Sequence, residues 1–120
     1  MILGAMVDAG VDQNALIQQL SLLNVAGFEL RFEKVKRAGL SATHAVVTIQ
    51  PEHAHRHLSD ILKIIDNSSL NSAVKERASK IFTRLAHAEA RVHNESVDDV
   101  HFHEVGALDA IVDVVGAAIC

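Results

Sequence analysis

The sequence predicts an α+β fold, with an antiparallel β-hairpin packed on several α-helices in a single domain that spans residues 1–120. Two observations support this prediction. Between Gly27 and Gln50 apolar residues alternate with polar ones, which is the period of a β-strand. On both sides of that stretch apolar residues recur every three or four positions, which is the period of a helix. No internal repeat, low-complexity tract or linker interrupts the chain, and its length suits one modest core.

The first segment is predicted to form two short helices. Residues 2–9 are a mostly apolar helical stretch that ends at Gly10, because glycine is favoured just past a helix end. Asp12 is expected to cap the second helix, which continues to about Asn24. The apolar face of this second helix consists of three leucines: Leu16, Leu20 and Leu23.

The hairpin follows from Gly27. In residues 28–33 two phenylalanines and a leucine alternate with charged residues, which is typical of a half-buried strand. Residues 37–39 are read as a turn. A second strand runs from about Leu40 to Gln50, and Pro51 stops it. We expect the two strands to pair antiparallel.

The remainder is predicted to be helical. Residues 58–65 form a short amphipathic helix, and residues 67–69 break it. A long helix with a continuous apolar stripe runs from Leu70 to about His93, and it would span roughly 36 Å at 1.5 Å per residue. A last helix occupies the C-terminal residues from about Leu108.

Composition excludes several classes of function. The formal net charge is −4 and only 11 basic residues are scattered along the chain, so nothing favours nucleic-acid binding. No apolar stretch is long enough to span a bilayer, so no membrane partner is expected. Cys120 is the single cysteine, which excludes a disulfide framework and suits a reducing cytoplasm.

Histidine is the most informative residue type, because five of the eight histidines fall into two clusters. One cluster is His101-Phe102-His103-Glu104. In an extended segment both imidazoles would point to one side and Phe102 to the core. Neutral imidazole binds nickel, copper and zinc, and a nearby carboxylate can complete or orient such a site. The alternative is that these are polar residues that precede the last helix, where the dipole at the helix N-terminus favours the negative charge of Glu104.

The other cluster contains His53, His55 and His57, just after Pro51. If the segment is extended, all three imidazoles share a face, whereas an early helix start aligns only His53 and His57. A solvated loop is an equally good reading. Neither cluster has a regular spacing such as His-Glu-x-x-His.

The two clusters would share a site if the chain after the long helix folds back along it. His55 or His57 would then lie within the reach of one ion or one small ligand from His101 or His103. The candidate metal ligands are therefore His101, His103, Glu104, His55 and His57.

The other titratable residues read mainly as surface groups. His44, His87 and His93 are expected to be ordinary half-exposed residues. Asp109 and Asp113 stand one turn apart on the last helix and could serve as ligands or as carboxylates that orient them. A solvated helix face is the favoured account of this pair.

Three segments resemble the N-terminal part of the LarC-type proteins, which insert nickel in the pathway to the nickel-pincer cofactor of lactate racemase. They are residues 1–10, residues 55–61 and, most specifically, residues 101–107 (HFHEVGA), which are followed by Asp109 and Asp113. The resemblance covers essentially the whole chain.

The resemblance implies a function that spacing alone does not show. Members of that family place nickel into a pyridinium mononucleotide that carries two thiocarboxylates, forming metal–carbon and metal–sulfur bonds. The reaction consumes CTP and uses manganese or magnesium, and it corresponds to a nickel chelatase or cyclometallase, a kind of lyase.

The resemblance also implies a fragment. The family pattern begins before Met1 with an apolar strand and a Ser-Gly-Asp turn, and it continues beyond Cys120 into a domain that carries the CTP site. We therefore expect the chain alone to be inactive. A missing strand would leave an edge for pairing with a second copy, so a homo-oligomer is expected.

Two alternatives remain open. The chain is either a non-catalytic module whose histidines collect nickel for a partner, or a structural domain whose helices mediate oligomerisation.

Overall fold

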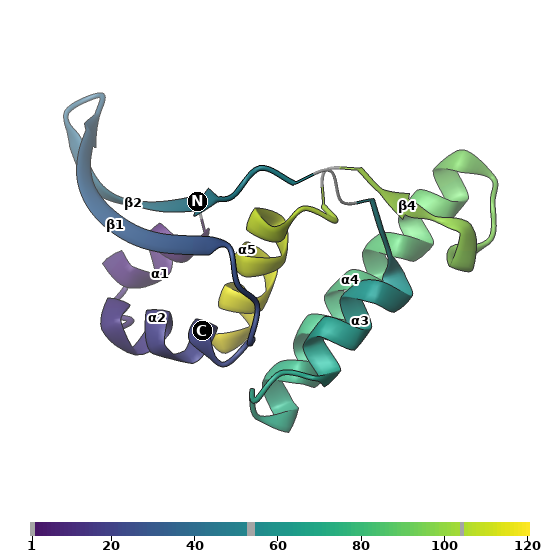
Figure 1. The fold of residues 1–120 in the computed structure, drawn as a ribbon. Helices are drawn as coiled ribbons and strands as arrows, with labels where there is room; N and C mark the ends of the chain where they lie inside the picture. The colour runs from purple at the N-terminus through teal and green to yellow at the C-terminus, as the bar shows by residue number, and fades with distance from the viewer. Residues whose placement is uncertain (1, 53–54, 104) are drawn as a thin grey trace.

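The α+β prediction is confirmed by a computed structural model that describes residues 2–52, 55–103 and 105–120 (Figure 1). The elements follow in the order α1 (Ile2–Asp8), α2 (Gln13–Ser21), β1 (Phe28–Arg37), β2 (Leu40–Ile49), β3 (Arg56–His57), α3 (Leu58–Asp66), α4 (Ser72–His93), the 3-10 turn η1 (Val97–Asp99), β4 (His101–Phe102) and α5 (Leu108–Ile119).

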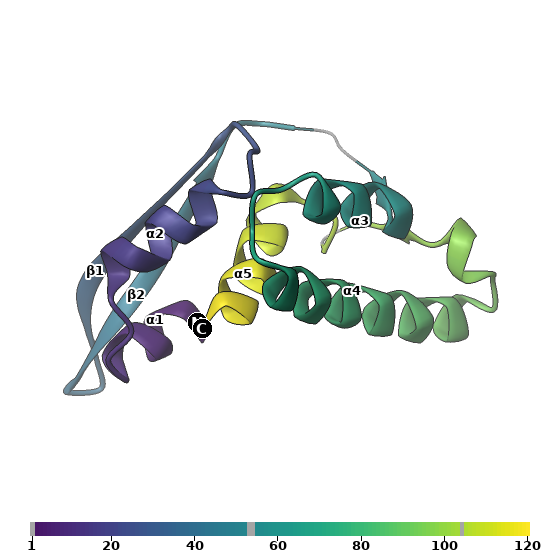
Figure 2. The ribbon, with the colours of Figure 1, turned by 90° about the horizontal axis from the view of Figure 1, so that it is seen from below.

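Helix α5 lies in the middle of the molecule. On one side of it stand α1, α2 and the hairpin of β1 and β2, and on the other side α3 and α4 run alongside each other (Figures 1 and 2). The contacts of α5 reach α1, α2, α4 and β2. This central position explains why α5 is the most apolar of the predicted helices, since it is covered on several sides.

The hairpin pairs antiparallel as predicted, from Phe28 opposite Ile49 to Arg37 opposite Leu40. Its loop is Ala38-Gly39, and both residues have positive φ, at 48° and 80°. That combination suits the twist of a two-residue hairpin turn. The alternation seen in the sequence buries Leu30 at 7% exposure, while the charged residues beside it face solvent.

Helix α1 covers part of β2. Both oxygens of the Asp8 carboxylate are used: Oδ2 accepts from the backbone N–H of Thr43 at 2.7 Å, and Oδ1 accepts from Thr43 Oγ1 at 2.6 Å and from Lys34 Nζ at 2.7 Å. The hydrogen bond from Lys34, together with those from Thr43, lowers the pKa of Asp8 to about 2. The edge of β2 is therefore occupied by α1 at Thr43, which is one way to protect a strand edge.

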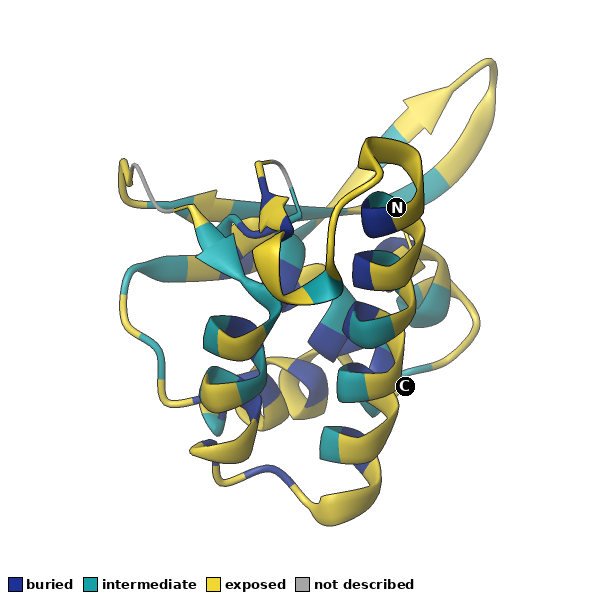
Figure 3. Ribbon diagram, turned by 90° about the vertical axis from the view of Figure 1, so that its right-hand side faces the viewer, coloured by how far each residue is buried: buried dark blue, intermediate teal, exposed yellow. Residues whose placement is uncertain are grey.

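The core lies between the helices, and in Figure 3 the buried stretches of the helices turn toward the middle of the molecule. The stripe of α4 is buried at five positions one turn apart: Val74, Ala78, Phe82, Ala86 and Ala90. The Asn71 side chain accepts from Val74 N at 2.9 Å to start this helix, and Asn94 ends it with a φ of 52°. Within the described ranges, no helix is both long and apolar enough to cross a bilayer.

Candidate metal centre

A second, very short sheet joins the two histidine clusters. Strand β3 pairs antiparallel with β4, with Arg56 opposite Phe102 and His57 opposite His101. This sheet was not expected, since two-residue strands carry no readable period. It places the segments around His55 and around His103 side by side, although the sequence separates them by α3 and α4.

The imidazoles meet in pairs across this sheet. The ring centres of His57 and His101 are 4.0 Å apart, with the planes inclined by 46°. Those of His55 and His103 are 5.4 Å apart, with the planes at 77°. The expected close approach of the two clusters is thus confirmed. Nitrogens about 2.0–2.1 Å from one ion put two ring centres about 4.5–5.5 Å apart, so the His55–His103 pair has a suitable spacing.

The ring of His57 is oriented by the backbone of its partner segment. Its Nδ1 lies 3.2 Å from the carbonyl oxygen of Val100. A carbonyl oxygen only accepts, so Nδ1 is the donor in this contact, and in the neutral ring Nε2 then has the lone pair. The backbone N–H of His57 donates to Asp60 Oδ2 at 2.9 Å. A histidine held in this way is typical of metal ligands, whose second ring nitrogen usually donates to a carbonyl or carboxylate.

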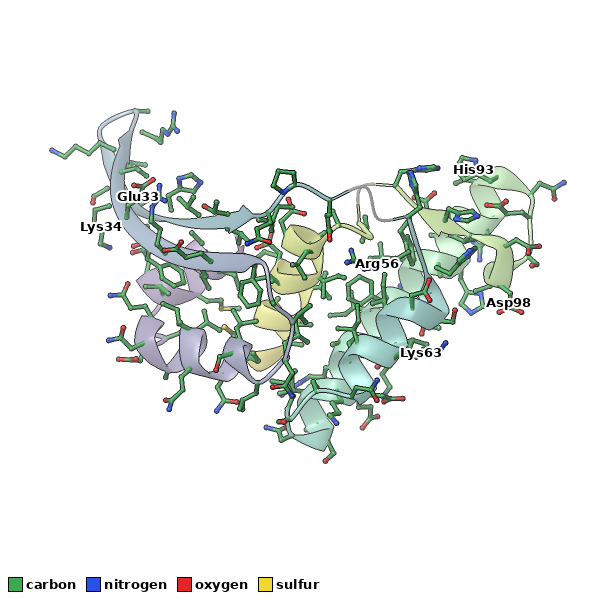
Figure 4. All side chains as sticks on the ribbon, in the orientation of Figure 1. Glu33, Lys34, Arg56, Lys63, His93 and Asp98 are labelled. Atoms are coloured by element: carbon green, nitrogen blue, oxygen red, sulfur yellow. The ribbon has the colours of Figure 1, made fainter. Side chains whose placement is uncertain are left out.

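An ion pair ties both histidine segments together. Arg56 donates to both carboxylate oxygens of Glu52, at 3.0 and 3.1 Å, and to the carbonyl oxygen of Gly106 at 2.6 Å. Glu52 also accepts from the backbone N–H of Leu108 at 3.0 Å, at the start of α5. The hydrogen bond from Arg56, reinforced by that from Leu108, lowers the pKa of Glu52. Arg56 thus reaches from β3 toward the segment before α5 (Figure 4).

Phe102 anchors β4 to the core. It is only 2% exposed and makes an edge contact with Phe82 of α4, at 6.4 Å between ring centres. Gly106 packs against it so closely that a Cβ there would lie 2.6 Å from the Phe102 carbonyl oxygen. His101 and His103, on either side of Phe102, are exposed. The predicted alternation of this segment is therefore confirmed.

The described side chains do not form a ready-made ion site. Among residues 2–52, 55–103 and 105–120, no three histidine, cysteine, aspartate or glutamate side chains converge closely enough to hold a metal ion. Two candidates of the sequence, His53 and Glu104, lie outside the described residues. The four described candidates, His55, His57, His101 and His103, are brought together, and their role as ligands stays a prediction.

The other titratable candidates lie outside this cluster. His44 is on the hairpin, 3.7 Å from Glu33, and His87 is exposed on α4. On α5, Asp109 is exposed. Asp113 is exposed as well, so both residues agree with the solvated-face reading, although partial desolvation and, to a lesser extent, Asp109 raise the pKa of Asp113.

The comparisons with known proteins place the chain among the metal-inserting proteins. The family model described as nickel insertion protein matches residues 1–120, and the chain belongs to this family. No solved structure matches the chain.

Several relatives are named pyridinium-3,5-bisthiocarboxylic acid mononucleotide nickel insertion protein. Those of Acetivibrio thermocellus, Desulfitobacterium hafniense and Geobacillus kaustophilus are 47%, 50% and 46% identical to this chain. The alignments cover 100%, 99% and 99% of this chain, but only 32%, 30% and 31% of the relatives. The chain therefore spans about a third of the length of these proteins.

Proposed function

We propose that this chain is the N-terminal, nickel-handling part of an enzyme that inserts nickel into pyridinium-3,5-bisthiocarboxylic acid mononucleotide. Membership of the nickel insertion family supports the metal, and the names of the relatives support the substrate. The observation that carries the assignment of the site is the 5.4 Å spacing of the His55 and His103 rings across the short sheet, with His57 and His101 paired beside them.

Imidazole is a suitable ligand for nickel that must be passed on. Its nitrogen binds divalent nickel well, and thiolate-type sulfur is the softer donor. The mononucleotide named for the relatives offers thiocarboxylates, so sulfur can take the ion from imidazole. The exposed positions of His55, His101 and His103 leave the ion accessible to such an acceptor. The contact of His57 with the Val100 carbonyl and the burial of Phe102 would hold the donors in place while the ion moves.

CTP and its manganese or magnesium ion are expected to bind elsewhere in the whole protein. The relatives contain about twice as much additional chain as is present here. The sequence of these 120 residues has no glycine-rich phosphate loop. We also expect the protein to act in the cytoplasm and to form a homo-oligomer through pairing of strand edges.

Calorimetric titration of Ni²⁺ into the chain tests this proposal. We expect stoichiometric binding that the double variant His101→Ala/His103→Ala loses, because one imidazole of each pair is removed. The matched controls are His44→Ala and His87→Ala, which remove imidazoles outside the cluster and should leave the titration unchanged. Stoichiometric binding that survives the double variant, or no binding by the unsubstituted chain, would contradict the proposal.

Assays of nickel insertion separate the alternatives. The remaining part of the protein is supplied together with this chain, the mononucleotide, CTP and manganese. Turnover that depends on His101 and His103 supports the split enzyme. Nickel binding without turnover under these conditions supports a module that only collects nickel, and the absence of both supports a structural domain.

A further inference from the structure

A hollow of about 220 Å³ lies beside the paired histidines. Its lining residues come from two distant parts of the chain: Glu89, His101, Phe102, His103 and Val105. Four of them belong to the segment that follows Val100, and Glu89 belongs to the last turns of α4. The hollow therefore brings a carboxylate next to two exposed imidazoles, although eleven residues separate Glu89 from His101 in the sequence.

The position of Glu89 follows from the packing of β4 on α4. Phe102 is held against Phe82 of the helix. One and two turns further along α4, Ala86 and Ala90 are buried at 0% and 6% exposure, and their small side chains let the chain approach closely. Glu89 precedes Ala90, so it stands at the border between the buried stripe and solvent.

Glu89 is also oriented from its own helix. Its Oε2 lies 3.3 Å from Nε2 of His93, one turn later, and the two side chains are 47% and 60% exposed. Figure 4 shows His93 at the end of α4, near β4. A carboxylate offers about four acceptor positions, so the contact with His93 leaves room for another ligand interaction. Glu52 differs from it, because Glu52 already accepts from Arg56 and from Leu108.

We propose that Glu89 is the carboxylate ligand of a nickel ion held by His101 and His103, with His93 orienting the carboxylate. This inference rests on the function proposed above. Two neutral imidazoles leave the charge of the ion uncompensated, and a carboxylate in the same hollow supplies an oxygen ligand and a negative charge. Ligating carboxylates are usually hydrogen-bonded by a further group, which is the role of His93. All these side chains are partly or fully exposed, so they can rotate onto the ion within nanoseconds.

The test is a Ni²⁺ titration of Glu89→Gln, which keeps the shape of the side chain and removes its charge. We expect the affinity to fall by about tenfold or more, as is common when the surroundings of a metal site are altered. The matched control is Glu76→Gln. Glu76 lies on the same helix and pairs with Lys80 one turn later at 2.6 Å, but it lines a different hollow. This control should bind nickel as the unsubstituted chain does, and circular dichroism confirms that each variant is folded.

The outcomes separate this inference from the proposed function. If Glu89→Gln binds nickel normally while His101→Ala/His103→Ala does not, Glu89 is not a ligand and the proposed function stands. If Glu104→Gln weakens binding and Glu89→Gln does not, the carboxylate is that of Glu104 and this inference is overturned. If the unsubstituted chain binds no nickel, both fail.

Discussion

Arg56 donates two parallel hydrogen bonds, at 3.0 and 3.1 Å, to the carboxylate oxygens of Glu52, which stands four residues earlier in the chain. The same guanidinium nitrogen that donates to Glu52 Oε1 also reaches the carbonyl oxygen of Gly106, fifty residues away. The pair therefore connects the segment that carries His55 and His57 to the loop that follows His103. It is 17% and 26% exposed, so solvent screens it only in part.

The contacts of Arg56 with Glu52 and Gly106 form a clamp, and its removal is predicted to destabilise the protein. Arg56→Met leaves the Glu52 carboxylate and the Gly106 carbonyl without their charged donor. Because both groups are partly buried, we expect the free energy of unfolding to fall by about 1–3 kcal/mol. Urea unfolding measures the change. The control is Lys80→Met, which breaks the exposed pair with Glu76 and should leave the unfolding midpoint unchanged. Equal midpoints for Arg56→Met and the unsubstituted chain would show that the clamp contributes nothing.

Asp8 is predicted to titrate near pH 2 in the folded protein. An unfolded aspartate titrates near 3.9, so the folded pKa is depressed. The stabilisation from ionised Asp8 is therefore present above about pH 4 and is lost as the pH falls toward 2. NMR titration of the carboxyl carbon measures the value. Lys34→Met should raise it, since Lys34 is the main cause of the shift, whereas Lys36→Met on the same strand should not. An Asp8 pKa that Lys34→Met leaves unchanged would contradict this account.

Gly4→Ala is predicted to destabilise the protein, although alanine normally favours a helix over glycine by about 1 kcal/mol. A Cβ on Gly4 would collide with the backbone carbonyl of Thr43, which cannot move without shifting β2. We expect the free energy of unfolding of Gly4→Ala to be lower by about 1–3 kcal/mol or more. Gly116→Ala is the comparison, because its Cβ would meet the flexible end of Leu3 at 2.7 Å. Thermal unfolding should show a smaller loss for Gly116→Ala, and the reverse order would refute the packing of α1 on β2.

Phe102→Ala is predicted to lower stability and nickel binding together. Truncation of a buried phenylalanine costs about 3–5 kcal/mol. It also removes the contact with Phe82 that holds β4 on α4, so the imidazoles of His101 and His103 lose their fixed position. Phe102→Leu keeps an apolar anchor and should retain more of both properties. Calorimetry under conditions where both variants are folded is decisive, because normal nickel affinity in Phe102→Ala would separate the site from this anchor.

Nickel affinity is predicted to depend on pH. Protons compete with the ion for imidazole lone pairs, and free imidazole side chains take up a proton near pH 6.5. The affinity should be full at neutral pH and fall as the pH drops through this range. Titrations at several pH values measure the change, and the residual affinity of His101→Ala/His103→Ala should vary less. An affinity that stays constant into the mildly acidic range would argue against imidazole ligation.

The sequence by itself was sufficient for the helices, for the hairpin and for the direction of several side chains. The alternation after Gly27 predicted the hairpin, and the apolar stripe predicted the long helix to its end at His93. It also predicted that Phe102 turns into the core between two exposed histidines. These features depend on local periodicity, which is set by which side of a strand or helix meets the core.

Only the tertiary structure decided how the candidate site is assembled. The sheet of β3 and β4, the contact of Arg56 with Gly106 and the hollow lined by both Glu89 and His103 join residues that belong to different segments. Two-residue strands are too short to show a period in the sequence. The sequence around a polar residue on a helix does not indicate which distant residue will lie near it. Such contacts arise from the packing of Phe102 on α4 and from the path of the chain around it.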